Sequence, residues 1–261
     1  MSTLITVETP VGVFVAPLGD LITGQLIRHG AHAGAELGLL GTVLGKGDIV
    51  IDIGAHIGTF AVPLARVVGV DGIVVCFEPW PASYDLLDLN VELNGLGRIV
   101  VTRRIAMGDR PGRFRVAAVD EENTGAAHLE ADDDGPVAAV TLDGWMSRNP
   151  WLDRLDLLKI DTEGMELAVL TGAAATLEEH SPMVYAEIAE EQLGRAGATS
   201  AQIESVLRDR GYRLFRNVGE RHGWDSQFRL VEIPSLSAEE LFDVLAVPDA
   251  HLHRVAPLVA A

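Results

Sequence analysis

The stretch VIDIGAHIGTF, residues 50–60, decides the fold class of this chain. It begins as an apolar, β-branched run typical of a buried strand, and a glycine-containing turn then leads into a segment with helical spacing. Gly54 and Gly58 have the spacing Gly-x-x-x-Gly, which lets a ligand approach the backbone at a helix N-terminus. A tight turn that binds no ligand would also account for these two glycines.

Asp52 lies just before this turn. The glycine spacing differs from the Gly-x-Gly-x-x-Gly pattern that binds pyrophosphates, and an acid at this point would repel a pyrophosphate. We expect Asp52 to favour a ligand with cationic groups, such as the ammonium and sulfonium of S-adenosylmethionine.

A second acid, Glu78, follows the next predicted strand, residues 73–77. It comes roughly 20 residues after the glycine turn, where dinucleotide-binding folds place the acid that holds a ribose. A solvated loop acid or a charge at a helix start would be the alternative. Because both elements occur together, the sequence favours a nucleoside ligand.

Short apolar runs alternate with helical segments along most of the chain, which predicts right-handed crossovers and a doubly wound, parallel α/β sheet. We predict helices at residues 58–68, 81–93 and 165–177, and strands at residues 49–53, 73–77, 99–103, 155–160 and 183–188.

Two regions depart from this alternation. Predicted strands at 113–119 and 137–140 flank a polar loop, which we interpret as an insertion over the carboxyl edge of the sheet. Residues 212–218 and 228–233 predict a closing hairpin. We therefore expect an N-terminal extension, residues 1–45, followed by one Rossmann-like domain, residues 46–261.

The composition limits the partners of this chain. It has 261 residues and a net charge of −18, which disfavours nucleic acid and anionic membrane surfaces as partners. Residues 1–10 contain no basic region followed by an apolar run, and no apolar stretch is as long as a membrane span, so we expect a cytoplasmic protein without a signal peptide. The sequence does not determine the oligomeric state and is compatible with a homo-oligomer.

Several further motifs occur in the same order as in a known family. The chain resembles FkbM-type methyltransferases over roughly residues 45–190, through the segments GDIVIDIGAHIG (47–58), FEP (77–79), NVELN (90–94), TLD (141–143), LKIDTEGME (158–166), LTGA (170–173) and VYAE (184–187).

This resemblance implies the fold of class I methyltransferases and the transfer of a methyl group from S-adenosylmethionine to oxygen, often on sugars or natural products. His56 stands where the family usually has Asn. The residues expected to bind the cofactor are Asp52, Gly54, Ala55 and Gly58 at its methionine end, Glu78 and Pro79 at the ribose, and Met107, in the turn 106–108, near the adenine.

Asp161 ends the predicted strand that lies beside the first strand in the class I order, so we expect it to face the cofactor and the acceptor. A helix N-cap is the alternative. Glu187 ends the following strand at the same ligand-binding edge. There it could act as a base, a metal ligand or a substrate anchor. Glu163 and Glu166 would either take part in function or complement a helix dipole.

His222, in the tail loop, is a further candidate base, and the inserted loop at 123–125 would cover the cofactor. Asp161 and Glu187 could together bind Mg²⁺ with waters and a substrate diol. Because the spacing identifies no third ligand, we favour a metal-free reaction.

The sequence thus predicts an O-methyltransferase that acts on a hydroxyl of a small molecule or sugar. A nicotinamide-dependent oxidoreductase would share the strand, turn and ribose acid, although the glycine spacing and Asp52 argue against it. A non-catalytic nucleoside-binding protein of the same fold is the second alternative.

Overall fold

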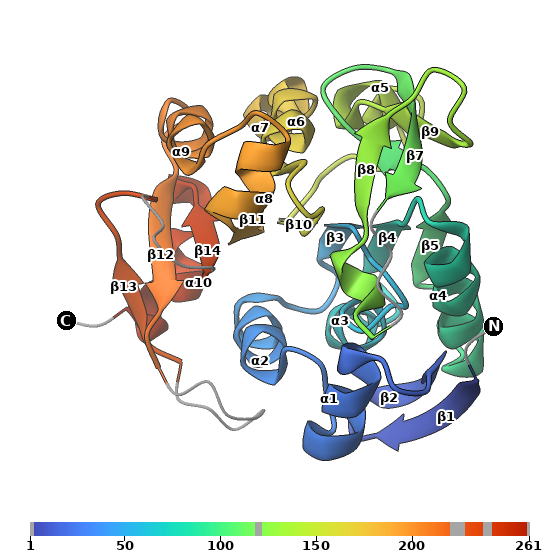
Figure 1. Cartoon of the computed structure of the whole chain (residues 1–261). Helices are drawn as coiled ribbons and strands as arrows, with labels where there is room; N and C mark the ends of the chain where they lie inside the picture. The colour runs from blue at the N-terminus through green and yellow to red at the C-terminus, as the bar shows by residue number, and fades with distance from the viewer. Residues whose placement is uncertain (1–2, 118–121, 220–227, 237–241, 260–261) are drawn as a thin grey trace.

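The computed structural model describes residues 3–117, 122–219, 228–236 and 242–259. Its central feature is a sheet of eight strands in the order β13-β12-β14-β11-β10-β3-β4-β5 (Figure 1). These strands are β3 (Ile49–Ile53), β4 (Ile73–Phe77), β5 (Val100–Arg103), β10 (Leu157–Ile160), β11 (Met183–Ile188), β12 (Arg213–Asn217), β13 (Leu230–Glu232) and β14 (Phe242–Val247).

The five strands from β11 to β5 are parallel, whereas β14 is antiparallel to both of its neighbours, β11 and β12. β10 lies beside β3, as predicted. This strand order confirms the doubly wound α/β fold and the class I methyltransferase arrangement of the sheet.

Both faces of the sheet are buried, which explains why its strands are continuous apolar runs. Val50 and Val74 face one core, which α2 (Gly34–Val43), α3 (Ala61–Val68) and α4 (Pro81–Leu93) cover. Ile51 and Val75 face the other core. That second core is covered by α5 (Leu142–Met146), α6 (Glu166–Thr171), α7 (Ala174–His180), α8 (Glu190–Arg195) and α9 (Ser200–Arg208).

One predicted helix, at 165–177, is in fact the two helices α6 and α7, which are separated at Gly172. A Cβ on Gly172 would lie 2.0 Å from the carbonyl oxygen of Gly108. The break therefore coincides with a close backbone contact to the turn after β6, which the helical spacing alone does not predict.

The predicted closing hairpin is present, because β12 and β13 pair as antiparallel strands. β14, which the sequence pattern does not predict, lies between β11 and β12 in the sheet. α10 (Leu252–Val255) follows it, between two short 3₁₀ turns, Asp249–His251 and Ala256–Leu258.

The predicted insertion forms a second sheet of four strands together with β6, which lies in the segment predicted as the turn 106–108; the strand order is β6-β9-β7-β8. Its elements are β6 (Ala106–Met107), β7 (Gly112–Ala117), the 3₁₀ turn η1 (Thr124–Ala126), β8 (His128–Ala131) and β9 (Val137–Val140). The polar loop expected between two strands thus contains a third strand, β8. Figure 1 shows η1 below this sheet, near α1.

The segment predicted as the N-terminal extension contains β1 (Leu4–Thr9), β2 (Gly12–Pro17), α1 (Leu21–His29) and α2. Two asparagines, one in α4 and one at its C-cap, attach β2 to the domain. Asn90 accepts a hydrogen bond from the Val15 backbone N–H at 2.7 Å, and Asn94 accepts one from that of Val13 at 3.0 Å. Both asparagines belong to the motif NVELN, so these two residues of the motif have a structural role: they hold β2 against α4.

Among the residues that the structure describes, no helix combines the length and the hydrophobicity needed to cross a membrane.

Candidate active site

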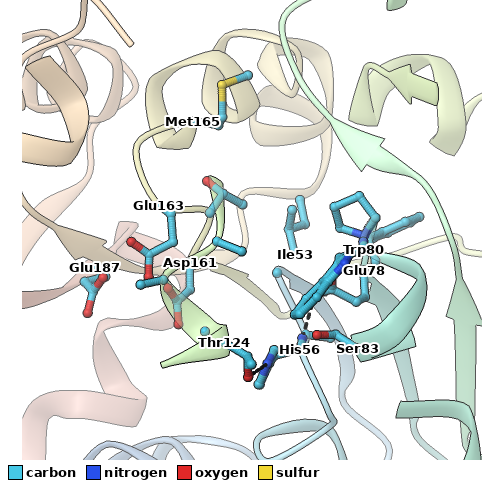
Figure 2. A pocket seen from close by; sticks show the side chains of 18 of the residues that line it. Ile53, His56, Glu78, Trp80, Ser83, Thr124, Asp161, Glu163, Met165 and Glu187 are labelled. Carbon is cyan, nitrogen blue, oxygen red and sulfur yellow. Dashed lines mark hydrogen bonds between the residues drawn. The ribbon is translucent and has the colours of Figure 1, made fainter. Parts of the chain in front are cut away.

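A cavity of about 410 Å³ lies at the carboxyl ends of β3, β4, β10 and β11, where open α/β sheets bind their ligands. The insertion and α1 contribute further walls, through Thr124 and Ile22 among others. Figure 2 shows Asp161, Glu163 and Glu187 on one side of the cavity and Glu78 with Trp80 on the other. We refer to these as the carboxylate side and the Glu78 side.

Glu78 is held in place by two backbone donors. Its Oε2 accepts a hydrogen bond from the His56 N–H and its Oε1 one from the Trp80 N–H, both at 2.8 Å. Burial raises the pKa of Glu78 to about 7, although these two bonds oppose the shift. Each carboxylate oxygen can accept a further hydrogen bond, so this side chain can bind a pair of ligand hydroxyls.

The Glu78 side is otherwise mostly apolar. Its walls include Pro79 and Trp80 after β4, and Ile105, Ala106 and Met107 at the start of the insertion. Met107 is only 3% exposed, so its side chain is packed within the wall. Apolar walls beside a carboxylate that can accept hydrogen bonds from hydroxyls are suited to a nucleoside.

The two glycines of the turn have different roles. Gly54 and Ala55 line the cavity, whereas Gly58 does not. A Cβ on Gly58, whose φ is +88°, would lie 2.9 Å from Cδ1 of Leu87 in α4. The structure therefore corrects the expected ligand contact of Gly58, because this glycine allows the turn to pack against α4.

Asp52 also differs from its expected role. It is 0% exposed and does not line the cavity. In the β3–β10 register Asp52 lies opposite Lys159, so both side chains lie on the same face of the sheet, and their charged atoms are 3.1 Å apart. The cation that Asp52 meets is therefore Lys159 of this chain, not a ligand.

Lys159 links the buried sheet to the cavity. Its ammonium is 3.4 Å from Asp161 Oδ2 and 4.6 Å from the centre of the Phe60 ring. Burial opposes the charge on Lys159, but Asp52 and Asp161 outweigh it and raise its pKa. The ammonium therefore stays charged at neutral pH and orients Asp161 at the cavity wall.

The carboxylate side contains a third acid, Glu163, beside the two predicted as candidate metal ligands. One carboxylate oxygen each of Asp161, Glu163 and Glu187 lies within 4.8 Å of the others. Burial, followed by the charge of Asp161, raises the pKa of Glu163 to about 7 and that of Glu187 to about 9. Glu187 therefore holds a proton at neutral pH and Glu163 holds one part of the time, and a cation could replace these protons.

The loop after β10 is fixed by Glu166. Its Oε1 accepts hydrogen bonds from the backbone N–H of Thr162 at 2.9 Å and from that of Gly164 at 3.2 Å. Glu166 is only 2% exposed, so its role is to shape this loop. Asp161 does not cap α6, whose N-cap residue is Met165.

A chain of hydrogen bonds joins the glycine turn, the insertion and α1. Thr124 Oγ1 donates to Asp20 at 2.8 Å, and Nε2 of His56 lies 3.1 Å from the same hydroxyl oxygen. Because the Asp20 carboxylate only accepts, the Thr124 proton points to it, and His56 must donate from Nε2. Burial lowers the pKa of His56 to about 4, so its ring is neutral.

Of the other predicted residues, the loop 123–125 lines the cavity, whereas His222 lies outside the described residues. Lys159 is a further residue of the site that was not predicted, although a lysine within a buried strand indicates an ion pair. Asp20, His32 and Phe60 were not predicted either.

The sequence matches the family model described as the methyltransferase FkbM domain over residues 52–214. This chain belongs to the FkbM methyltransferase family. It is 28% identical over 208 residues to methyltransferase sdnD of Sordaria araneosa, which covers 68% of this chain and 78% of that protein. It is 25% identical over 200 residues to methyltransferase 1 of Beauveria bassiana, which covers 68% and 76% respectively.

Solved structures of methyltransferases are also similar. The FkbM methyltransferase of Methylobacillus flagellatus aligns with a TM-score of 0.46 at 18% identity, over 70% of this chain and 43% of that one. A SAM-dependent O-methyltransferase of Thermotoga maritima aligns with a TM-score of 0.46 at 14% identity, over 94% of this chain and 85% of that one.

Proposed function

We propose that this chain is an S-adenosylmethionine-dependent O-methyltransferase whose acceptor is a polar small molecule or sugar. The observation that carries the proposal is the pairing of two unlike sides in one cavity. The Glu78 side offers apolar walls with a hydroxyl-binding carboxylate, and the carboxylate side offers Asp161, Glu163 and Glu187.

The residues fit the cofactor. Glu78 would bind the ribose hydroxyls, with the adenine between the walls that contain Trp80 and Met107. Gly54 and Ala55 would lie along the methionine part, and Asp161 would attract its ammonium group. Bound there, the cofactor supplies an electrophilic methyl group.

The acceptor class follows from the polar groups beyond the Glu78 side. Asp161 accepts hydrogen bonds when ionised, the protonated Glu187 carboxyl both donates and accepts them, and Gln25 and Gln192 also line the cavity. Such a wall binds several hydroxyls at once and suits a sugar or polyol better than a hydrocarbon. A cytoplasmic location fits a cofactor of this kind and is part of the proposal.

We propose that the reaction needs no metal ion. Asp161, Glu163 and Glu187 are close enough to bind one. However, Asp161 already has the Lys159 ammonium at 3.4 Å, and Glu163 accepts a hydrogen bond from the Gln192 amide. To bind there, Mg²⁺ would have to displace the Lys159 ammonium and the Gln192 amide, or share the two carboxylates with them.

The test is a methyl-transfer assay with isotopically labelled S-adenosylmethionine and a panel of methyl glycosides and polyols, with the products identified by mass spectrometry. We expect one class of hydroxylated compound to gain a methyl ether. Asp161→Ala removes the carboxylate expected to bind the cofactor's ammonium and should lower turnover by about 10- to 100-fold, since a hydrogen bond to a charged group is worth about 1.5–3 kcal/mol. Asp209→Ala, at the exposed C-cap of α9, should leave turnover unchanged.

Two results would contradict the proposal. Methylation of an amine or a carbon atom would exclude the O-methyl assignment. Loss of activity after exhaustive chelation, with recovery only on addition of Mg²⁺ or Mn²⁺, would exclude the metal-free reaction.

A further inference from the structure

His32 lies in the short connection between α1 and α2 and lines the cavity of the proposed active site. Its Nδ1 is 2.8 Å from Oε1 of Gln25, a residue of α1. No second hydrogen bond to this ring occurs within the described part of the chain. With Nδ1 turned to Gln25, Nε2 on the opposite side of the ring is left for a ligand.

The contact with Gln25 fixes the position of the proton on the ring. An amide oxygen only accepts hydrogen bonds, so Nδ1 of His32 must carry the proton and donate it. Nε2 of a neutral ring is then an unprotonated acceptor. A histidine oriented by a fixed acceptor behind it has the arrangement of a general base.

The surroundings keep the ring neutral and oriented. Burial lowers the pKa of His32, and the charge of Lys159 acts in the same direction, whereas Asp161 and Asp20 oppose it. The ring makes a T-shaped contact with Phe60, with ring centres 6.3 Å apart, and Phe60 also contacts the Lys159 ammonium. His32 and Asp161 are therefore linked through Phe60 and Lys159.

The acids of the carboxylate side are less free to act as a base. Asp161 is paired with Lys159, and Glu163 accepts a hydrogen bond from Gln192. Glu187 holds its own proton at neutral pH, because burial and the charge of Asp161 raise its pKa to about 9. The open nitrogen of His32 has no such competitor among the described residues.

We propose that His32 is the general base of the methyl transfer and that Gln25 is its positioning residue. This inference rests on the proposed O-methyltransferase function. The acceptor hydroxyl gives its proton to Nε2 while its oxygen forms a bond to the methyl carbon. The carbon–sulfur bond breaks, its electron pair stays on sulfur, and the imidazolium then releases its proton to water.

The first test needs no acceptor. The full chain, labelled with ¹⁵N at its histidines, is saturated with S-adenosylhomocysteine and studied by long-range ¹H–¹⁵N NMR. His32→Gln identifies the His32 signals. We expect a neutral ring with the proton on Nδ1, and we expect Gln25→Ala to produce a mixture of tautomers. A proton on Nε2 in the wild-type complex would overturn the proposal.

The second test measures turnover with the best acceptor from the glycoside and polyol panel. His32→Ala should lower kcat by a factor on the order of 100 to 10,000, with KM for S-adenosylmethionine changed less than threefold. Added imidazole should restore part of this loss, because it can occupy the vacated space. His29→Ala, on the exposed end of α1, should behave as wild type with and without imidazole.

A kcat within threefold of wild type for His32→Ala, or a loss that imidazole does not restore, would overturn the assignment. Failure of the wild-type chain to bind S-adenosylhomocysteine would instead count against the proposed function. The two failures are therefore distinguishable.

Discussion

A Cβ on Gly54 would lie 1.7 Å from the carbonyl oxygen of Asp161, so the glycine turn and the end of β10 are in direct backbone contact. Gly54 also has a φ of +81°, which disfavours other residues. Because Asp161 stands at the cavity wall, this contact sets the distance between the two strand ends that build the site.

Gly54→Ala should therefore destabilise the whole domain, not merely hinder a ligand. Gly197→Ala is the matched control, because Gly197 has a φ of +73° but nothing within 4 Å of its added Cβ. We expect the control to cost about 1 kcal/mol of unfolding free energy, and Gly54→Ala to cost at least twice as much. If urea denaturation gave the same loss of unfolding free energy for both variants, the contact with Asp161 would be unimportant for stability.

The hydrogen bonds of Thr124 should also contribute to stability. Thr124→Val removes the hydroxyl that Asp20 and His56 share, and it leaves buried polar atoms unpaired. We expect a loss of about 1–3 kcal/mol in the free energy of unfolding. Thr171→Val, which removes an exposed hydroxyl on α6, should cost less than half as much. A similar loss for both variants would contradict the role given to this network.

Much of the fold is predictable from the sequence because its strands are short, β-branched runs buried on both faces. β14, with the sequence FDVLAV, was missed because a short apolar run after the segment SAEEL does not distinguish a strand from a helix. Its position between β11 and β12 depends on long-range pairing, which periodicity does not report.

The candidate site was predictable where a side chain follows directly from its strand end, as for Glu78 and Asp161. Asp52 was misassigned because the direction of its side chain depends on the register between β3 and β10, which brings it opposite Lys159. His32 could not be found from local sequence, since only the tertiary arrangement of α1 and its connection to α2 brings it into the cavity and against Phe60.

The carboxylate side should make stability depend on pH. The pKa of Glu187 is raised to about 9 by burial and by Asp161, Asp243 and Glu163. A carboxyl group whose pKa is raised by folding favours the folded state below its unfolded pKa of 4.5, and this contribution is lost as the pH rises toward 9. The ligand-free protein should therefore become less stable from pH 5 to pH 9.

Glu187→Gln removes this titration. We expect the variant to melt at a higher temperature than wild type at pH 8.5, with a smaller difference at pH 5, since one unit of pKa shift corresponds to about 1.4 kcal/mol. Glu191→Gln, on α8, is the control and should show no such pH dependence. A difference in melting temperature that is the same at both pH values would contradict the electrostatic account.

The most direct test of the central claim is calorimetric titration of the protein with S-adenosylhomocysteine. We predict binding by the wild-type chain and an affinity at least about tenfold lower for Glu78→Ala, because hydrogen bonds to a charged acceptor are worth about 1.5–3 kcal/mol each. Glu92→Ala, on α4, should bind as wild type does. Unchanged affinity in a folded Glu78→Ala protein, or no binding by the wild-type chain, would contradict the account.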